Sequence, residues 1–251
     1  MELAIGITFF IFGIVFGSFF NVVGLRVPLG EVFTNDRSRC PHCEQQLSAI
    51  ELIPLFSFLL QKGKCRHCAA PIGLMYPIIE LGTGLLFTFA YMQLGFTWEL
   101  ITVLLLISLA MILIVSDVRY MLIPNHILLS FLPLFIVLRI IHPLDPWWSS
   151  ITGAVGGFLL VMMIILVSRG GMGAGDMKLL GVLGIVLGLA KVLVTFFLAC
   201  LVGAIVGMLL KGWNKLGKKQ PIPFGPYLVL AALYTYFYGD GLIDWYLSLL
   251  Q

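Results

Sequence analysis

Two aspartates at the ends of long apolar runs are the residues best placed to do chemistry. Asp117 follows the apolar run 101–115, and Asp176 follows the glycine-rich stretch 170–175, which comes after a second apolar run. A carboxylate at membrane depth is costly and usually marks a function. The matching positions therefore indicate that the two side chains act as a pair.

A pair of adjacent carboxylates can hydrolyse a peptide bond by acid–base catalysis. Because like charges close together cannot both ionise, one carboxyl group keeps its proton near neutral pH. The charged group can take a proton from water, while the protonated group polarises the scissile carbonyl. This is aspartic-protease chemistry. Gly173 and Gly175 come directly before Asp176 and would let an extended substrate lie against the main chain.

Two other interpretations of the aspartates stay open. Each could cap a helix or pair with Arg119, Arg169 or Lys178 at the membrane interface. Acidic residues in membrane helices also mark proton and ion paths. The alternative function is therefore a membrane transporter, stabilised by the zinc site described below, with Asp117 and Asp176 as ion-coupling residues. The spans show no evident inverted repeat, and both carboxylates lie at the membrane edge, which disfavours a transporter.

The composition predicts an all-α polytopic membrane protein. Of 251 residues, 60% are hydrophobic and only 11% are charged, against about 25% charged in soluble domains. Spanning segments must be helices or closed barrels, and long continuous apolar runs favour helices. We expect about eight transmembrane helices, at residues 3–25, 77–94, 98–115, 127–141, 151–167, 179–189, 192–210 and 221–238.

The distribution of positive charge predicts the topology. With the N-terminus outside, 13 of the 15 lysines and arginines fall in inner loops or at inner helix ends, and only Arg139 and Lys191 fall towards the outside. This asymmetry is what the positive-inside rule requires. It places both Asp117 and Asp176 at the cytoplasmic face.

Two Cys-x-x-Cys pairs predict a structural zinc site in the longest hydrophilic loop. The pairs Cys40/Cys43 and Cys65/Cys68 are separated by 21 residues, a spacing typical of tetrahedral zinc sites. Disulfides are the alternative, but a cytosolic loop is kept reduced. A complete shell of four cysteines leaves no open position for catalysis.

The neighbours of these cysteines are assigned lesser roles. The basic side chains of Arg39, Lys64 and Arg66 favour the thiolate form of the ligands. His42 and His67 are interpreted as bystanders, since four cysteines already fill the shell.

The chain is expected to have three parts. Residues 1–26 form the first transmembrane helix, 27–76 a cytosolic zinc-knuckle domain with four cysteine ligands, and 77–251 the transmembrane peptidase core. The apolar segment 52–60 is too short to span a bilayer. It is either the small domain's own core or a segment that lies against the membrane.

The sequence closely resembles the type IV prepilin peptidases, bifunctional leader peptidase/N-methyltransferases of bacterial inner membranes, and most of all the type that processes competence pseudopilins. The resemblance covers nearly the whole chain. It rests on the four cysteines, on Asp117 followed by Ile123-Pro124-Asn125, and on these motifs: Gly17-Ser18-Phe19-Phe20-Asn21-Val22, Tyr76-Pro77-Ile78-Ile79-Glu80-Leu81, Gly173-Ala174-Gly175-Asp176 and Pro223-Phe224-Gly225-Pro226.

The resemblance implies an activity and a set of partners. Asp117 and Asp176 match the catalytic aspartates of Gly-x-Gly-Asp intramembrane proteases. The implied substrates are type IV prepilins or pseudopilins, cut on the cytoplasmic side of the bacterial plasma membrane after a basic leader. Methylation of the new N-terminus with S-adenosylmethionine is expected from the family alone. Glu80 could contact the substrate's leader or amine. We expect membrane lipid around the spans and no nucleic-acid partner.

Overall fold

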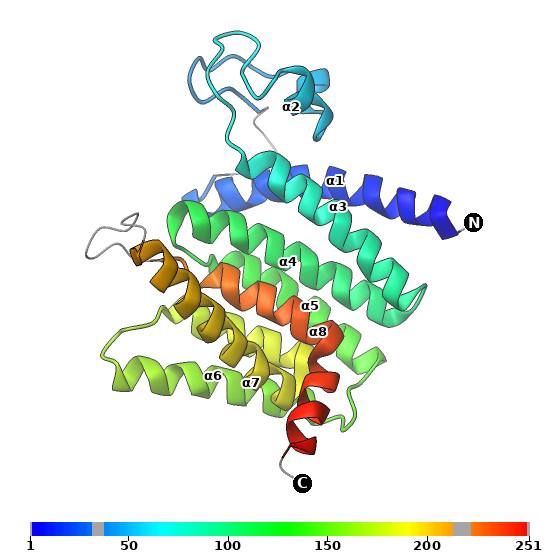
Figure 1. Cartoon of the computed structure of the whole chain (residues 1–251), viewed down its shortest axis with the longest axis vertical. Coiled ribbons are helices and arrows are strands. Elements are labelled where there is room, and N and C mark those ends of the chain that lie inside the picture. Colours follow the sequence, from blue (N-terminus) through cyan, green and yellow to red (C-terminus); the bar gives the residue numbers. More distant parts are fainter. Residues whose placement is uncertain (1, 32–37, 213–221, 250–251) are drawn as a thin grey trace.

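The computed structural model describes residues 2–31, 38–212 and 222–249 and confirms the all-α class (Figure 1). Within these ranges there is no β-strand, only two isolated bridges in the loop domain. The helices in chain order are α1 (Glu2–Arg26), η1 (Val27–Leu29), η2 (Ala49–Leu52), α2 (Phe56–Leu60), α3 (Met75–Leu94), α4 (Trp98–Tyr120), α5 (Asn125–Ile141), α6 (Ser149–Val167), α7 (Ala174–Gly212) and α8 (Gly225–Ser248).

Five of these helices, α1, α3, α4, α6 and α7, are long and apolar enough to cross a membrane. The apolar helix α5 is shorter, at 17 residues. The segment labelled α7 consists of two helices that meet in a kink at Gly188, where φ is 78° and ψ is 173°. The kink lies close to the boundary between the two predicted spans 179–189 and 192–210, so the structure also divides the chain there. The total of eight spans stays a prediction.

Helix α4 forms the centre of the helical bundle. It is the most buried of the five long helices, and it packs against α1, α3, α5 and α8. Figure 1 shows α1 and α3 on one side of it and α6 and α7 on the other. The last turn of α4 carries Asp117, so the aspartate lies where elements from both sides of the bundle meet.

Glycines allow the helices to approach closely, as small residues do in membrane proteins generally. The closest approach joins α6 to α7, where a Cβ on Gly153 would lie 2.4 Å from the carbonyl oxygen of Gly184. On the other side of the bundle, a Cβ on Gly13 of α1 would lie 2.6 Å from the Cα of Gly84 in α3. Both contacts are with main chain, so the helix spacing depends on these glycines.

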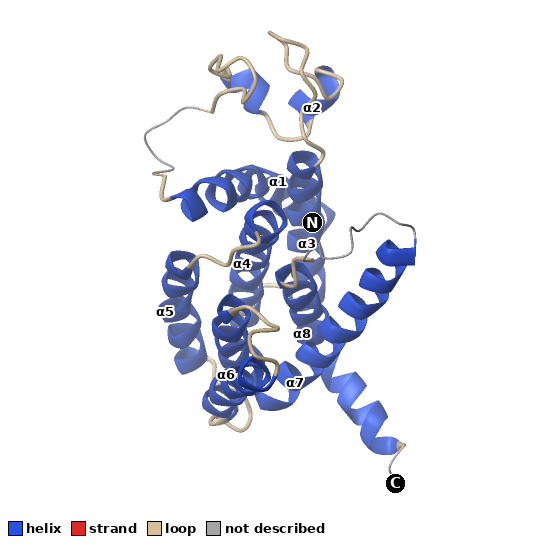
Figure 2. Cartoon of the chain, turned by 90° about the vertical axis from the view of Figure 1, so that its left-hand side faces the viewer, coloured by secondary structure: helices blue, strands red, loops and turns tan. Residues whose placement is uncertain are grey.

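The loop domain lies beyond the bundle, beside the C-terminal end of α1 and the N-terminal end of α3 (Figures 1 and 2). Its apolar segment is not an enclosed core, because Phe56, Leu59 and Leu60 are each more than half exposed. The exposed side chains argue against the interpretation that this segment is the domain's own core, and contact with the membrane stays a prediction. The domain therefore depends on something other than a hydrophobic core for its stability.

Replacing Gly184 by alanine should destabilise the α6–α7 contact. The new Cβ would lie 2.1 Å from the carbonyl oxygen of Gly153, and neither main chain can move without displacing its helix. Overpacking of this kind costs about 1–3 kcal/mol. The measurement is the thermal unfolding midpoint of the purified protein in detergent.

Gly241→Ala is the matched control, because a Cβ at this helical position meets no atom within 4 Å. It should leave the midpoint unchanged or raise it slightly, since alanine is favoured over glycine in helices by up to about 1 kcal/mol. Equal midpoints for the two variants would contradict the close-packing account.

Candidate active site

Asp117 is held at the start of helix α8. Its side chain is only 6% exposed, and its Oδ2 atom accepts a hydrogen bond of 2.8 Å from the main-chain N–H of Gly225. Gly225 is the first residue of α8 and Pro226 follows it. The first N–H groups of a helix have no hydrogen-bond partner inside the helix. The Asp117 carboxylate therefore pairs with a donor that would otherwise be unsatisfied.

Asp176 lies at the start of another helix. It is the third residue of α7, it is 8% exposed, and its carboxylate faces the main-chain N–H of Gly173. A Cβ on Gly173 would lie 3.1 Å from Oδ2 of Asp176. Glycine at this position therefore leaves room for the carboxylate.

The segments that follow and precede the two aspartates pack directly on each other. A Cβ on Gly175 would lie 2.9 Å from the Cβ of Ile123 in the α4–α5 connection. Beside this contact, the Lys178 ammonium donates a hydrogen bond of 2.9 Å to Oδ1 of Asn125. The Gly-x-Gly-Asp stretch and the Ile-Pro-Asn stretch are thus two halves of one contact between α7 and α5.

The two carboxylates belong to one electrostatic environment. The charge of Asp117 acts on Asp176, and in the described part of the chain neither aspartate forms an ion pair with Arg119, Arg169 or Lys178. The helix-capping interpretation applies in part, since both carboxylates meet helix N-termini. Helix N-termini carry partial positive charge. The N-termini of α7 and α8 therefore stabilise negative charge on the two aspartates.

Gly225 was not assigned a role from the sequence, although its motif belongs to the resemblance. A Cβ at this position would lie 2.8 Å from Oδ2 of Asp117. A Gly-Pro pair at the start of an apolar run is a recognisable helix start. The sequence contains no signal that this start faces Asp117, because the two residues are 108 positions apart.

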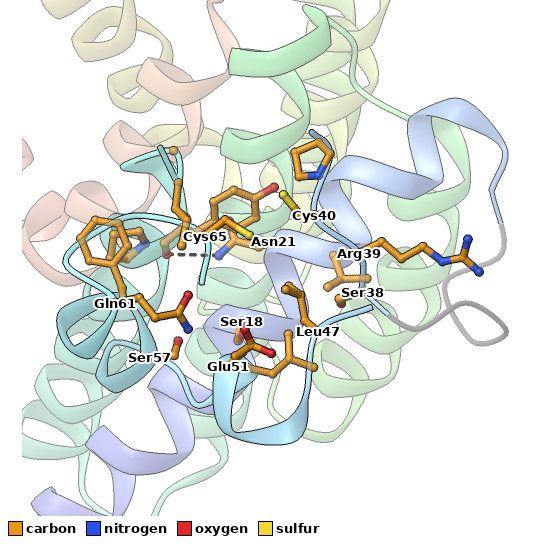
Figure 3. Close-up of a pocket in the computed structure, with 18 of the residues that line it drawn as sticks. Ser18, Asn21, Ser38, Arg39, Cys40, Leu47, Glu51, Ser57, Gln61 and Cys65 are labelled. Atoms are coloured by element: carbon orange, nitrogen blue, oxygen red, sulfur yellow. Dashed lines mark hydrogen bonds between the residues drawn. The ribbon is translucent and has the colours of Figure 1, made fainter. Parts of the chain in front are cut away.

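The structure does not bring Glu80 to the aspartates. Its Oε2 atom accepts a hydrogen bond of 2.8 Å from the main-chain N–H of Leu55 in the loop domain. It lines a cavity with Asn21, whose Nδ2 donates to the carbonyl oxygen of Tyr76 at 3.2 Å (Figure 3). Contact of Glu80, Gly173 or Gly175 with a substrate stays a prediction.

The four predicted ligand cysteines lie together. The Sγ atoms of Cys40, Cys43, Cys65 and Cys68 are all within 4.8 Å of one another, and those of Cys40 and Cys68 are 3.8 Å apart. A tetrahedral shell with Zn–S bonds of about 2.3 Å separates its sulfurs by about 3.8 Å. The four thiols can therefore hold a metal ion of this size and geometry.

The two cysteine pairs lie on equivalent turns. The carbonyl of Cys40 accepts from the N–H of Glu44, and that of Cys65 accepts from the N–H of Ala69, each at 2.9 Å. Glu44 and Ala69 both have positive φ, at 56° and 59°. The same turn thus occurs twice in the loop domain, and each copy carries two of the four thiols.

The turns favour the thiolate form of the first cysteine in each pair, Cys40 and Cys65, whereas burial and the other three thiols raise the pKa of Cys68 to about 12. The main-chain N–H groups of Cys43 and His42 lower the pKa of the Cys40 thiol to about 6. His67 lies outside the cluster, with its Nε2 atom 3.6 Å from a carboxylate oxygen of Glu51.

Comparison with known proteins supports a family assignment. Residues 11–94 match the bacterial peptidase A24 N-terminal domain, and residues 104–208 match the type IV leader peptidase family. No solved structure gives a significant match.

Three curated relatives that match over nearly their whole length are each named prepilin leader peptidase/N-methyltransferase. The protein from Bacillus subtilis strain 168 is 42% identical, with 96% of this chain and 97% of the relative covered. That from Aeromonas salmonicida strain A449 is 34% identical, with 99% and 98% covered. That from Stutzerimonas stutzeri is 33% identical, with 95% and 92% covered.

Replacing Cys40 and Cys43 together by serine should abolish metal binding, because two ligands remain and a structural site needs four. The metal content of purified protein, measured by inductively coupled plasma mass spectrometry, should fall from about one zinc per chain to near zero. The yield of folded protein should also fall.

Cys200→Ser is the control for this experiment, because Cys200 lies in α7 and outside the cluster. Its metal content should equal that of the wild type. Zinc retained in the Cys40/Cys43 double variant would remove the metal site from this account.

Proposed function

Because the chain belongs to the type IV leader peptidase family, we propose that it cleaves the leader from type IV prepilins or pseudopilins with Asp117 and Asp176 as its catalytic pair. The chain is a multi-pass membrane protein by its five apolar helices. Relatives named for leader peptidase activity align over nearly all of it.

The observation that carries the residue assignment is the placement of the two carboxylates. Both are buried, both meet the N-terminus of a helix, and one acts electrostatically on the other. Burial of two carboxylates without a cationic partner is costly, and their contacts with helix N-termini offset only part of that cost. A catalytic role for the pair explains why the protein keeps two buried carboxylates despite their cost in stability.

The chemistry follows from two carboxyl groups that share one proton. The charged carboxylate takes a proton from a water molecule, whose oxygen attacks the scissile carbonyl carbon. The protonated carboxyl gives its proton to the carbonyl oxygen, so a neutral tetrahedral species forms. Its collapse breaks the C–N bond, with a proton transferred to the leaving nitrogen. The helix N-termini at Gly225 and Gly173 keep the carboxylates oriented during these steps.

The position of the pair suits a substrate that is itself a membrane helix. Asp117 lies in the last turn of α4 and Asp176 in the first turn of α7, so both lie at one end of the bundle. The surplus of positive charge at that end supports a cytoplasmic location, with the N-terminus outside. A substrate with a basic leader on that side could present its scissile bond without unwinding at the midplane.

Two cofactors belong to this proposal. Zn²⁺ bound by the four cysteines would hold the loop domain of residues 27–76 together, between the first helix and the core of residues 77–251. The relatives' names include N-methyltransferase, which supports methylation of the new N-terminus with S-adenosylmethionine. Specialisation for competence pseudopilins stays a prediction. No structural feature in the described part of the chain favours the transporter alternative.

Co-expression with a prepilin tests the catalytic pair. The wild type should remove the leader, while Asp117→Asn and Asp176→Asn should each reduce cleavage by about 10²-fold or more, because each loses one acid–base function. The readout is the substrate's N-terminus, determined by mass spectrometry. Asp244→Asn makes the same change at an exposed site and should cleave normally. Cleavage by both test variants at the wild-type rate would end the proposal.

Replacing Gly225 by alanine should slow cleavage through Asp117. The added methyl group would lie 2.8 Å from the Asp117 carboxylate and displace it, and a shift of about 1 Å in a catalytic group can cost about 10²-fold in rate. The measurement is kcat for a prepilin in detergent.

Gly203→Ala provides the comparison for Gly225→Ala. Its Cβ would meet the Tyr227 ring at 3.5 Å, an ordinary contact, so kcat should stay near that of the wild type. An unchanged kcat in Gly225→Ala would show that the α8 N-terminus does not position the aspartate.

A further inference from the structure

The loop domain carries a group of apolar side chains that the described part of the chain leaves exposed. They are Ile50, Ile53, Phe56, Leu59 and Leu60, and Leu59 has the largest exposed fraction, at 72%. Apolar groups gathered on the surface of one small domain mark a contact with another protein or with a membrane. We call these five side chains the apolar patch.

The short helix α2 shows which way the apolar patch faces. Ser57, Phe58 and Gln61 line the cavity between the loop domain and α1 (Figure 3). Because each residue advances a helix by about 100°, the side chains of Phe56, Leu59 and Leu60 lie on the opposite face of α2. The apolar patch therefore points away from the helical bundle.

Helix α2 lies at the level of the membrane spans and not beyond their ends. The cavity that it lines reaches back to Ser18, eight residues before the end of α1 at Arg26, or about 12 Å along the helix. The main-chain N–H of Leu55 is bonded to Glu80, in the second turn of α3. Figure 1 shows α2 over the flank of α1, away from the C-terminal end of that helix. Because α1 and α3 are long and apolar enough to cross a membrane, α2 lies beside segments that are in the bilayer.

The charges next to the apolar patch suit a phospholipid surface. Lys62, Lys64 and Arg66 follow it in the sequence and are exposed. Glu51 is the only acidic residue between positions 50 and 66, and its side chain is just 6% exposed. Long basic side chains beside an apolar face can reach lipid phosphates while the apolar groups enter the acyl region.

The surroundings of the apolar patch favour lipid over a protein as its partner. Phe19 of α1 and Ile78 of α3 are also exposed apolar residues, and both lie in the turns that flank the loop domain. Residues at these positions of a spanning helix face lipid. The apolar patch thus continues a surface that the bilayer already covers.

We propose that the apolar patch inserts into the lipid bilayer beside α1 and α3, with Lys62, Lys64 and Arg66 at the level of the lipid phosphates. The loop domain is then attached to the membrane by its own side chains as well as through α1 and α3. The bilayer supplies apolar contacts that the domain lacks inside. This inference concerns the loop domain alone and does not depend on the proposed peptidase function.

Photochemical cross-linking of the full-length protein tests the proposal. The photoreactive amino acid p-benzoylphenylalanine takes the place of Leu59, and the protein is reconstituted into nanodiscs of phosphatidylcholine and phosphatidylglycerol. Ultraviolet light should attach phospholipid at this position, as mass spectrometry of the peptides would show. The same probe at Leu85, an exposed residue within the span α3, is the positive control. At Gln45, an exposed polar residue of the loop domain, it should give little or no lipid adduct.

Negative charge in the apolar patch should prevent insertion. With the probe at Phe56, the double change Leu59→Asp and Leu60→Asp should lower the yield of lipid adduct by about tenfold or more, because carboxylates resist transfer into the bilayer. Gln45→Asp with Gln46→Asp adds the same charge at exposed polar positions and should leave the yield unchanged. Unchanged zinc content would show that each variant keeps its cysteine turns. If the aspartate variant loses zinc, the labelling of the otherwise unaltered protein decides.

The proposal fails if lipid is attached at position 85 but not at 56 or 59, or if positions 45 and 59 are labelled equally. Adducts of position 59 with a second copy of this chain would assign the apolar patch to a dimer interface instead. Loss of lipid labelling in favour of a prepilin, when one is added, would assign it to the substrate. Cleavage is measured separately on the same nanodiscs, so lipid labelling without cleavage would sustain this inference and count against the catalytic pair.

Discussion

The bundle depends on the burial of two carboxylates at helix N-termini. Asp117 accepts from the first N–H of α8, and Asp176 faces the N–H of Gly173 at the start of α7. The first contact joins α4 to α8, and the second is local to the start of α7. They also require glycine where a side chain would strike a carboxylate or the opposing loop, at positions 173, 175 and 225. The active-site motifs are thus packing motifs as well.

The loop domain is stabilised in a different way from the helical bundle. Phe56, Leu59 and Leu60 of its apolar segment are exposed, so the domain must be ordered with little hydrophobic core, which small domains usually achieve with metal or disulfides. The cysteine cluster supplies such a cross-link within the domain. The bond from Leu55 to Glu80 then fixes the domain against α3, and the space left between them is the cavity that contains Asn21.

Much of the site could be predicted because its residues are conspicuous in the sequence. Asp117 and Asp176 are charged residues in apolar surroundings, and the spacing of the paired cysteines is typical of zinc sites. The role of Gly225 was missed because a contact over 108 positions has no local signature. The capping box formed by Ser48 and Glu51 was missed too, although its sequence pattern could have revealed it.

The central claim is that Asp117 and Asp176 share one site, and chemical cross-linking tests this most directly. In a Cys200→Ser background, cysteines replacing both aspartates should be joined by a short bifunctional thiosulfonate, as mass spectrometry of the peptides would show. Cysteines replacing Asn125 and Lys178, whose side chains lie 2.9 Å apart, provide the positive control. A cross-link in the control pair and none between positions 117 and 176 would contradict the account.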